Sequence, residues 1–442
     1  MDDVPAQPDR KNFQGFRGHS GQTDGRGVGR GGQGGAGFVS SNHKGGRAIK
    51  KKLRLAGKRK ISIQLKHGLT VQVEAYYYIR VRQESRGRKR KVGRRGKAGG
   101  GYYPLLSRIG VVANASPALC EDVVIEVLRE SYEEAHEALI RAGIEISIKR
   151  MRTITNALGR RSVELRDANK DGNKIEESCA GQIIAVAVDG GRTLIRTNSK
   201  GRPLASGYHG FSADWREPKL FTIYEVDEKG RKRKKGVVRC DGTFGGPDAL
   251  VELLAAELRR IDAANAIRVI FLGDGARWIW NRIDDIVEKA QIAPDRVLHC
   301  LDYYHAVEHL AKIAEAKSFP SQKERDKWLA KMKKMLKTST PQAFLDELQE
   351  AKCRGNHTIK CELNYFHKNS NAISYAEFTE NNLPIGSGAI ESAVRRVVNL
   401  RIKGAGTFWH LENAEAILHM RCQLKSGNWN KFYEDLLNSQ AA

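Results

Sequence analysis

The sequence predicts an α/β fold in which helices cover both faces of a mixed β-sheet. Three strand-like segments follow one another after residue 181, and from residue 247 helical segments alternate with strand-like runs. That order is typical of a mixed sheet with helices on both faces. The strongest strand-like run, residues 267 to 272, leads into Asp274 in an Asp-Gly turn, and a tryptophan-rich segment follows at once. A carboxylate at the carboxyl end of a buried strand is where an open α/β sheet usually carries its chemistry.

The N-terminal hundred residues predict little folded structure apart from one hairpin. Residues 1 to 60 are rich in Gly, Lys, Arg and Ser and cannot bury enough apolar surface to offset chain entropy, so we expect them to be disordered. Phenylalanines interleaved with arginines there would suit loose contact with nucleic acid, and a plain flexible tail is the alternative. Alternating residues from 61 to 82, around His67-Gly68, predict a β-hairpin. The basic run that follows is expected to be a linker.

Residues 116 to 160 predict a compact unit of three helices, with breaks near Ser131 and at Ala142-Gly143. Two short helices around a glycine turn fit a helix-turn-helix, whose second helix enters the major groove of DNA. The last helix carries three basic residues that would then contact DNA: Lys149, Arg150 and Arg152. Three small helices are also a common way to build any small α domain, which is the structural alternative.

The segment from Gly181 predicts a first core strand that ends on Asp189. Residues 193 to 198 and 220 to 232 predict the second and third strands, the run ending at Asp274 the fourth, and the run ending at Asp302 the fifth, with helices between the later ones. This order matches a ribonuclease-H-like core, in which the first and fourth strands lie side by side. The two aspartates Asp189 and Asp274 would therefore meet, although they are far apart in the sequence.

The chain should accordingly divide into six segments. These are a disordered basic, glycine-rich arm (1–60), a β-hairpin and basic linker (61–100), a helix-turn-helix-like DNA-binding unit (101–165), the first part of the ribonuclease-H-like core (181–315), an α-helical insertion (316–380), and the last part of the core with a catalytic glutamate helix (381–442).

Three acidic residues, Asp189, Asp274 and Glu391, are the candidates for catalysis and for binding metal. Phosphodiester cleavage needs an activated water or 3′-hydroxyl, and two Mg²⁺ (or Mn²⁺) ions roughly 4 Å apart provide it. Hard cations take carboxylate oxygens, and because Mg²⁺ keeps several waters, three acids suffice. The structural alternatives are Asp-Gly turn chemistry for the aspartates and dipole compensation at a helix N-terminus for Glu391.

Several side motifs accompany these acids. Asp302 and His305 could orient the metal cluster or a flipped end nucleotide, whereas a zinc site at His305 and His309 is disfavoured because the HExxH order is absent. Trp278, Trp280 and Trp409 are more often core residues than base-stacking ones. Three basic residues near Glu391 are candidates for contacting DNA, with a solvated basic surface as the alternative: Arg395, Arg401 and Lys403.

The formal net charge of +25 points to a polyanionic partner, because a merely soluble surface needs far less charge. No apolar run approaches the roughly 20 residues that span a bilayer, and the N-terminus has no secretory pattern, so we expect no membrane association. The seven cysteines are scattered without CxxC spacing, which argues against a disulfide framework or a thiolate zinc site. These features predict a cytoplasmic protein associated with the nucleoid.

The motifs resemble those of DDE transposases from bacterial insertion sequences, specifically the ISKra-type group of a Mutator-like superfamily. The resemblance covers roughly residues 100 to 425, with GYYPL at 101–105 as a further match. It is carried by four motifs in order: VAVDGG (186–191), GDGARWIWN (273–281), LDYYHAVEHL (301–310) and GSGAIESAVRRVVNLRIKGAG (386–406).

The resemblance implies that Asp189, Asp274 and Glu391 are the DDE triad, and that Asp302 and His305 match the C/D-x-x-H element of the superfamily. It also implies a ribonuclease-H-like fold with an α-helical insertion before the glutamate. The expected partners are terminal inverted repeats and target DNA, bound by a homodimer or larger assembly. Relatives often carry a cysteine zinc ribbon before the GYYP segment, and this sequence has Arg and Gly there instead. End recognition would then rest on the basic arm and the helical unit.

Two other functions remain open from the sequence. One is a non-catalytic nucleic-acid-binding protein on the same fold, against which the intact acids argue. The other is a plain ribonuclease-H-like nuclease that cleaves without strand transfer.

Overall fold

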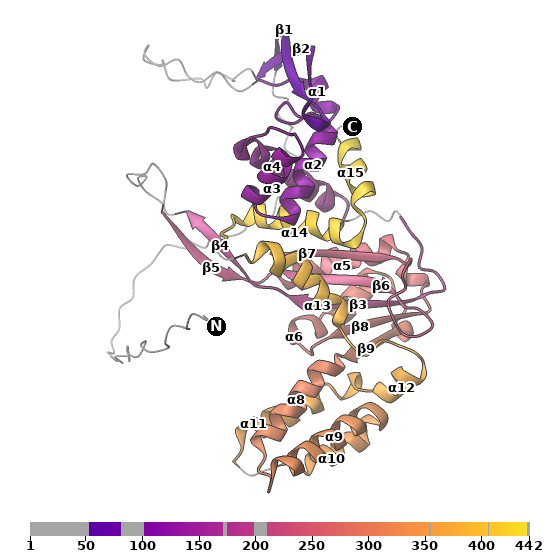
Figure 1. Ribbon diagram of the computed structural model, residues 1–442. Coiled ribbons are helices and arrows are strands. Elements are labelled where there is room, and N and C mark those ends of the chain that lie inside the picture. Colours follow the sequence, from indigo (N-terminus) through magenta and orange to yellow (C-terminus); the bar gives the residue numbers. More distant parts are fainter. Residues whose placement is uncertain are drawn as a thin grey trace, which may run out of the picture. The chain divides into compact units, whose positions relative to one another are not determined.

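The computed structural model of the protein describes residues 53–80, 101–170, 175–198, 210–352, 355–404 and 406–439 (Figure 1). The expected arm, up to residue 52, and the basic linker lie outside the described residues. Within these ranges no helix has both the length and the apolar character that crossing a bilayer demands.

The described strands and helices follow one another along the chain in the order of their numbers. The strands are β1 (Leu53–Gln64), β2 (Thr70–Arg80), β3 (Ile183–Gly190), β4 (Thr193–Asn198), β5 (Phe211–Arg216), β6 (Lys219–Glu225), β7 (Val238–Thr243), β8 (Arg268–Gly273) and β9 (Val297–Leu301). The helices are α1 (Pro104–Arg108), α2 (Pro117–Arg129), α3 (Tyr132–Arg141), α4 (Ile148–Ala168), α5 (Pro247–Arg260), α6 (Arg277–Trp280), α7 (Ile283–Lys289), α8 (Tyr303–Ala316), α9 (Gln322–Thr338), α10 (Pro341–Gln349), α11 (His357–Lys368), α12 (Tyr375–Glu380), α13 (Gly388–Val394), α14 (Leu411–Ser426) and α15 (Trp429–Asn438). Short 3₁₀ turns are η1 (Lys66–Gly68), η2 (Ala263–Asn265), η3 (Pro294–Arg296) and η4 (Ser370–Ala372), and a π-helical stretch, η5 (Arg395–Ile402), continues α13.

The central sheet has five strands in the order β7-β6-β3-β8-β9. Strands β3, β8 and β9 run parallel, whereas β6 and β7 are antiparallel to their neighbours. The predicted mixed sheet is therefore confirmed, and so is the expectation that the strand ending in Asp189 lies beside the strand that precedes Asp274.

One predicted strand belongs to a different sheet. Residues 193 to 198 form β4, which pairs with β5 in a separate two-stranded sheet instead of joining the core. The edge of the core is occupied by β7, which the sequence pattern did not predict. The physical reason is that β7 buries polar residues, Arg239, Asp241 and Thr243, so it lacks the apolar alternation of a half-buried strand.

Helices pack on both faces of the central sheet, as predicted. Ile184, Val186 and Val188 of β3 face a core that α5 and α7 complete. The intervening residues Ala185 and Ala187 face the opposite core, to which α13 and α14 contribute. Successive side chains of a strand point to opposite faces, so this alternation places β3 at the centre of a three-layer arrangement.

The segment between β9 and α13 is helical, in agreement with the predicted α-helical insertion. Helices α9, α10, α11 and α12 follow α8, and the described residues there include no strand. Figure 1 shows α8 to α11 packed side by side below the sheet. Their shared core includes Leu336, Phe344 and Phe366, each essentially inaccessible to solvent.

The N-terminal helices α2, α3 and α4 form the predicted three-helix unit. Ser116, Ser131 and Ser147 cap their N-termini, and Gly143, with φ of 75°, makes the turn between α3 and α4. The long α4 then packs on α14. Gly159 permits this close approach, because a Cβ atom there would lie 2.9 Å from the Cβ of Ala416. The final segment is thus helical and packs on α4.

The predicted hairpin is confirmed, but it starts earlier than residue 61. Strand β1 begins at Leu53 and pairs with β2 across a register shift between Leu55 and Lys58. Gly57 lies in that bulge with φ of 90°, which a side chain would strain. The bulge interrupts the alternation on which the predicted boundary depended. The turn lies at η1, which contains the expected His67-Gly68.

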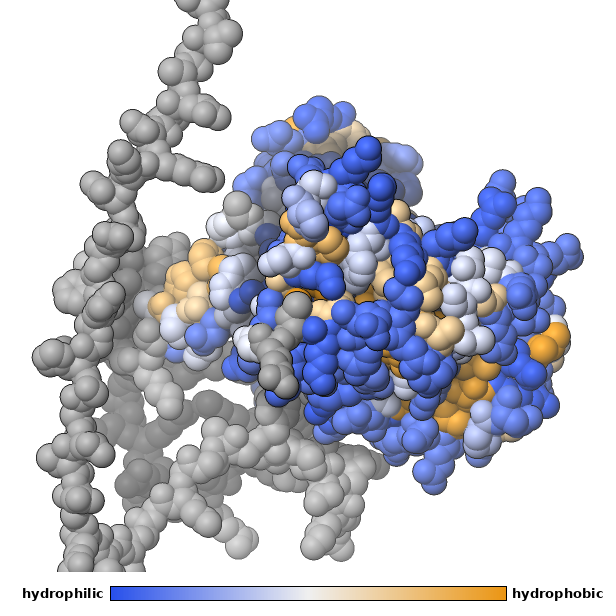
Figure 2. Space-filling view, turned by 90° about the horizontal axis from the view of Figure 1, so that it is seen from below, coloured by the Kyte–Doolittle hydropathy of each residue, from blue (hydrophilic) through white to orange (hydrophobic). Residues whose placement is uncertain are grey.

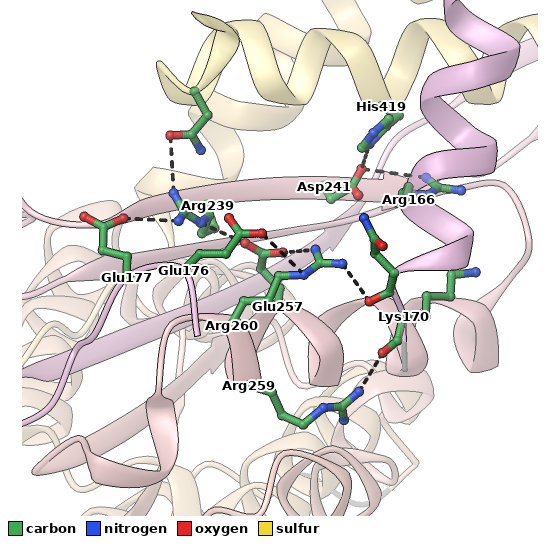
Figure 3. Close-up of polar contacts among 12 residues, drawn as sticks. Arg166, Lys170, Glu176, Glu177, Arg239, Asp241, Glu257, Arg259, Arg260 and His419 are labelled. Atoms are coloured by element: carbon green, nitrogen blue, oxygen red, sulfur yellow. Dashed lines mark hydrogen bonds and ion pairs between the residues drawn. The ribbon is translucent and has the colours of Figure 1, made fainter. Parts of the chain in front are cut away.

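A buried polar network joins α4 to the edge of the sheet (Figure 3). The Arg166 guanidinium bonds the Gly242 carbonyl at 3.2 Å and the Glu415 carboxylate at 2.7 Å, and it lies 3.8 Å from Asp241. Asp241 also contacts His419 at 3.0 Å. Burial alone would raise the pKa of Asp241, but the charges of His419 and Arg166 lower it overall. The network therefore keeps Asp241 ionised inside the protein.

A second set of ion pairs continues along the same edge (Figure 3). Arg239 of β7 and Arg260 of α5 each contact the Glu257 carboxylate at 2.8 Å. Arg259 and Arg260 also donate to the carbonyls of Lys170 and Asn169, beyond the end of α4. Together the two sets attach the three-helix unit to the core through charged groups rather than apolar packing alone.

We expect Arg166→Met to lower the free energy of unfolding by about 3 to 5 kcal/mol, because it removes the guanidinium that neutralises the buried Asp241 and the partly buried Glu415. Urea unfolding of the full chain measures this. The control is Arg141→Ala, whose exposed partner Glu137 lies 4.0 Å away, and it should change stability by no more than about 0.5 kcal/mol. Equal losses in both variants would contradict a role for the buried network.

Candidate active site

Asp189 and Asp274 lie at the same end of the central sheet, where β3 and β8 finish. Asp189 is the penultimate residue of β3, and Asp274 directly follows β8. Because the two strands are adjacent and parallel, their carboxyl ends meet. Glu391 comes from the first turn of α13, the helix that packs over β3 and β6. The structure thus brings all three predicted acids to one end of the sheet.

The electrostatics of Asp189 show that these acids share one neighbourhood. Partial burial raises the pKa of Asp189, and the negative charges of Asp274, Glu391 and Glu217 raise it further, against the lowering effect of a hydrogen bond of 2.6 Å from the Gly190 amide. The site therefore concentrates negative charge that a cation would relieve.

The donor set fits a hard divalent cation in kind, since all three side chains offer carboxylate oxygens. Each is engaged locally: Asp274 accepts from the Ala276 amide at 2.8 Å, and Glu391 lies 3.4 Å from the Ser387 hydroxyl. Within the described ranges, no group of three or more His, Cys, Asp or Glu side chains converges closely enough to hold a metal ion. Side-chain rotation would be needed to bring the three carboxylates onto shared ions, and both Asp274 and Glu391 are exposed enough to rotate.

Asp302 ties the segments that carry the other acids together. It is 1% exposed, and its amide donates to the Gly273 carbonyl, next to Asp274, at 2.7 Å. Its carboxylate accepts from the His305 amide at 2.8 Å, which caps α8, and from the Ser387 amide just before α13. Asp302 is thus placed as a positioning residue. The His305 ring is half-buried and lies 3.4 Å from Glu308.

The helical insertion also reaches the site, which the sequence did not predict. The Tyr365 hydroxyl on α11 donates to the Asp274 carbonyl at 2.9 Å. Its ring stacks on His309, with centroids 3.6 Å apart, and His309 in turn bonds Glu362. No motif surrounds Tyr365 in the sequence, so only the packing of α11 on α8 reveals this contact.

A lysine and a glutamate beside Asp189 were likewise missed. Lys219 begins β6 opposite Gly190, and its ammonium group lies 2.5 Å from the Glu217 carboxylate and 4.0 Å from the centre of the Trp278 ring. Gly190 makes room for this pair, because a Cβ atom there would collide with the Glu217 carboxylate. Neither residue belongs to a recognisable motif, so only the cross-strand register places them at the site.

The basic residues predicted on α4 differ in their placement. Lys149 and Arg152 are exposed. Arg152 lies 3.8 Å from Glu133. Arg150 instead donates to the Ala113 carbonyl at 2.9 Å and to the Gln64 side chain at 2.5 Å, so its guanidinium joins α4 to the hairpin. That placement favours a structural role for Arg150.

The basic residues predicted after Glu391 also divide. Arg395 and Lys403 are exposed. Arg401 is 7% exposed and donates to the Val127 carbonyl at 2.9 Å, with its guanidinium 5.1 Å from the Trp409 ring. Its side chain therefore joins η5 to α2 instead of facing solvent as a phosphate clamp would. Trp409 is buried, as expected of a core tryptophan.

Comparison with known proteins adds little to this geometry. No protein-family model matches the chain, and no curated protein matches it. Among solved structures the chain is similar to the Drosophila P element transposase strand transfer complex, with 13% sequence identity and a TM-score of 0.22 over 73% of this chain and 81% of that chain. A TM-score this low establishes no common fold.

We expect Asp302→Ala to lower stability by about 2 to 4 kcal/mol, because it removes a helix cap and leaves the buried Ser387 amide without an acceptor. Thermal unfolding measures the loss. Thr340→Ala removes the cap of α10, away from the acids, and should cost only about 1 kcal/mol. If the two variants lost equal stability, the hydrogen bond from the Ser387 amide to the Asp302 carboxylate would contribute nothing to the free energy of unfolding.

The raised pKa of Asp189 predicts a pH-dependent gain from Asp189→Asn. The folded protein binds the proton more tightly than the unfolded chain, so the ionised carboxylate destabilises the fold above the raised pKa. Without divalent metal, the variant should melt at a higher temperature than the parent at neutral pH. The gain should shrink as pH falls and vanish below the ordinary value of 3.8. The exposed Asp295→Asn is the control, and a gain independent of pH would contradict the assignment.

Proposed function

We propose that the protein is a DNA transposase that cleaves the ends of a transposable element and joins them to target DNA. The observation that carries the proposal is the meeting of Asp189 and Asp274 on adjacent parallel strands, with Glu391 contributed by a helix over the same sheet end. Cleavage would be a hydrolysis, and joining a strand transfer by the freed 3′-hydroxyl.

The order of the central sheet supports a ribonuclease-H-like core. In chain order its strands are β3, β6, β7, β8 and β9, with the first beside the fourth and the second running opposite to the other four. That is the arrangement expected for such a core. The helices α9 to α12 stand before Glu391, where a DDE transposase would carry its helical insertion.

Asp189, Asp274 and Glu391 would hold two Mg²⁺ or Mn²⁺ ions, which when bound supply charge neutralisation at the phosphodiester and activation of the attacking oxygen. The chain itself fixes where that happens. Asp302 holds the Gly273 carbonyl and the Ser387 amide, so it sets the spacing between the Asp274 turn and the Glu391 helix. The Tyr365 hydroxyl also holds the turn, through the Asp274 carbonyl.

DNA is the proposed partner, in the form of terminal inverted repeats and target duplex. The net charge of +25 favours a polyanion, and Lys149, Arg152, Arg395 and Lys403 are exposed where phosphates could reach them. The unit of α2 to α4 is the proposed element for recognising the ends, and a homodimer or larger assembly on DNA is the expected active form.

The alternative is a nuclease on the same core that cleaves without joining. Oligonucleotides that carry the element's ends, incubated with plasmid target and Mg²⁺, separate the two functions. Joined products support the transposase, whereas cleavage without joined products supports the nuclease.

We expect Asp274→Asn to reduce cleavage at least about a hundredfold, because losing a metal ligand should cost more than losing a residue that merely supports one. Duplex binding should be retained or tightened, since one negative charge is removed. Asp295→Asn removes the same charge from the exposed η3 turn and should leave cleavage unchanged. Undiminished cleavage by Asp274→Asn would falsify the proposed site.

A further inference from the structure

The β4–β5 hairpin leaves the core beside Asp189 and presents one face to solvent. Antiparallel pairing sets Leu194 opposite Trp215, Arg196 opposite Ala213, and Asn198 opposite Phe211, so these side chains share a face. Trp215 is 51% exposed and Phe211 43% exposed, so two large aromatics on the same face of β5 are open to solvent. The opposite face is the one that packs inward, with Thr193 and Ile195 buried.

Two arginines lie against these rings. The Arg192 guanidinium is 5.1 Å from the centre of the Trp215 ring, and the Arg196 guanidinium is 4.4 Å from the centre of the Phe211 ring. Phe408, 39% exposed, adds a third ring 5.3 Å from Phe211. We call this set the aromatic ladder: Arg192, Arg196, Phe211, Trp215 and Phe408. It combines flat apolar faces with fixed positive charge.

The base of the hairpin is held rigidly. The Arg196 amide donates to the Trp409 carbonyl at 2.8 Å, and the Trp409 amide donates to the Leu194 carbonyl at 3.2 Å. The Thr193 hydroxyl and the Trp409 indole both donate to the Ile402 carbonyl, at 3.1 and 2.9 Å. A ligand on the aromatic ladder would therefore meet a preformed surface and lose little binding energy to ordering it.

The position of the ladder links it to the acids. Arg192 follows Asp189 by three residues, and the Gly191 amide donates to the Pro218 carbonyl at 2.9 Å, which closes the hairpin next to β6. Figure 1 shows β4 and β5 leaving the central sheet together. In Figure 2 the surface is mostly hydrophilic, and one of its few apolar patches lies at the left margin, on the side where Figure 1 has this hairpin.

We propose that the aromatic ladder binds the unpaired bases of a DNA strand beside the acidic site, an inference that rests on the proposed function. Base stacking on aromatic side chains requires bases that no longer stack within a duplex, and cleavage of the two strands at staggered positions leaves such bases in a single-stranded overhang. Arginines in contact with both ring and solvent suit the adjoining phosphates. Arg192 and Arg196 form no ion pair with any of the described residues, so their charges favour a polyanion over a mainly apolar protein surface.

The test is binding of fluorescein-labelled oligothymidine to the full-length protein, followed by fluorescence anisotropy in buffer that contains EDTA. Trp215→Ala and Phe211→Ala should each weaken binding roughly 5- to 150-fold, the usual effect of removing one stacking side chain. Trp215→Phe, which keeps a ring, should restore most of the affinity. Binding of a blunt duplex should change by less than about twofold, because duplex contacts are mainly to phosphates.

Phe319→Ala is the matched control. Phe319 also lies near a cation and a second ring, with the Lys317 ammonium 5.9 Å from its centre and Trp328 at 5.8 Å, but it belongs to the helical insertion. This variant should bind oligothymidine like the parent. Because Trp215 and Phe211 are exposed, unchanged melting temperatures are expected for their variants.

Three results would overturn the proposal. The first is parental affinity for oligothymidine in the Trp215→Ala/Phe211→Ala double variant. The second is a change of oligomeric state in that variant with DNA binding intact, which would assign the ladder to a protein interface. The third is an effect of the two substitutions on binding of oligouridine RNA with no effect on binding of oligothymidine. The binding assay contains EDTA and does not depend on cleavage. A negative result in it therefore leaves the cleavage test of Asp274→Asn unaffected, and a negative cleavage test likewise leaves the binding result unaffected.

Discussion

The parallel pairing of β3 with β8 is the constraint on which the candidate site depends. It sets Asp189 and Asp274 together at one sheet edge, where their charges and that of Glu391 raise the pKa of Asp189. Such crowding opposes folding, and two buried cores, one on each face of the sheet, hold the strands in register against it. Asp302 then fixes the turn after β8 to the loop before α13. The hydrophobic scaffold therefore stabilises an arrangement of charges that would be unfavourable by itself.

The remaining parts of the chain attach to this core by different means. The three-helix unit is held by close apolar packing at Gly159 and by the ion pairs around Arg166. Both sets of contacts join α4 to α14. The helical insertion reaches the site through Tyr365. The β4–β5 hairpin is hydrogen-bonded through Trp409. Elements from widely separated regions of the sequence are therefore fixed to the same core, and the helical insertion reaches the turn at Asp274.

The sequence predicted the scaffold well because apolar periodicity reports burial directly. The strand that leads to Asp274 and the strand that carries Asp189 are continuous apolar runs, which indicates strands buried on both faces. It misplaced β4 and missed β7, since pairing partners are not encoded in a single strand. The polar residues of β7 are stabilised by ion pairs from α4, α5 and α14, and no local pattern records them. Likewise the sequence placed the start of β1 too late. The alternation of residues is interrupted at the bulge around Gly57, but the pairing of β1 with β2 continues beyond it to Leu53.

For the candidate site, the sequence by itself predicted the three acids, because an acid after a buried strand or in the first turn of a helix is a local feature. Only the tertiary structure decided what surrounds them. Lys219 and Glu217 reach Asp189 through cross-strand register, and Tyr365 reaches Asp274 through packing of the insertion. Arg150 and Arg401, which resemble exposed basic residues in the sequence, donate to carbonyls across element boundaries. Whether a charged side chain faces solvent or a distant backbone depends on which elements pack together, and that is a property of the folded chain.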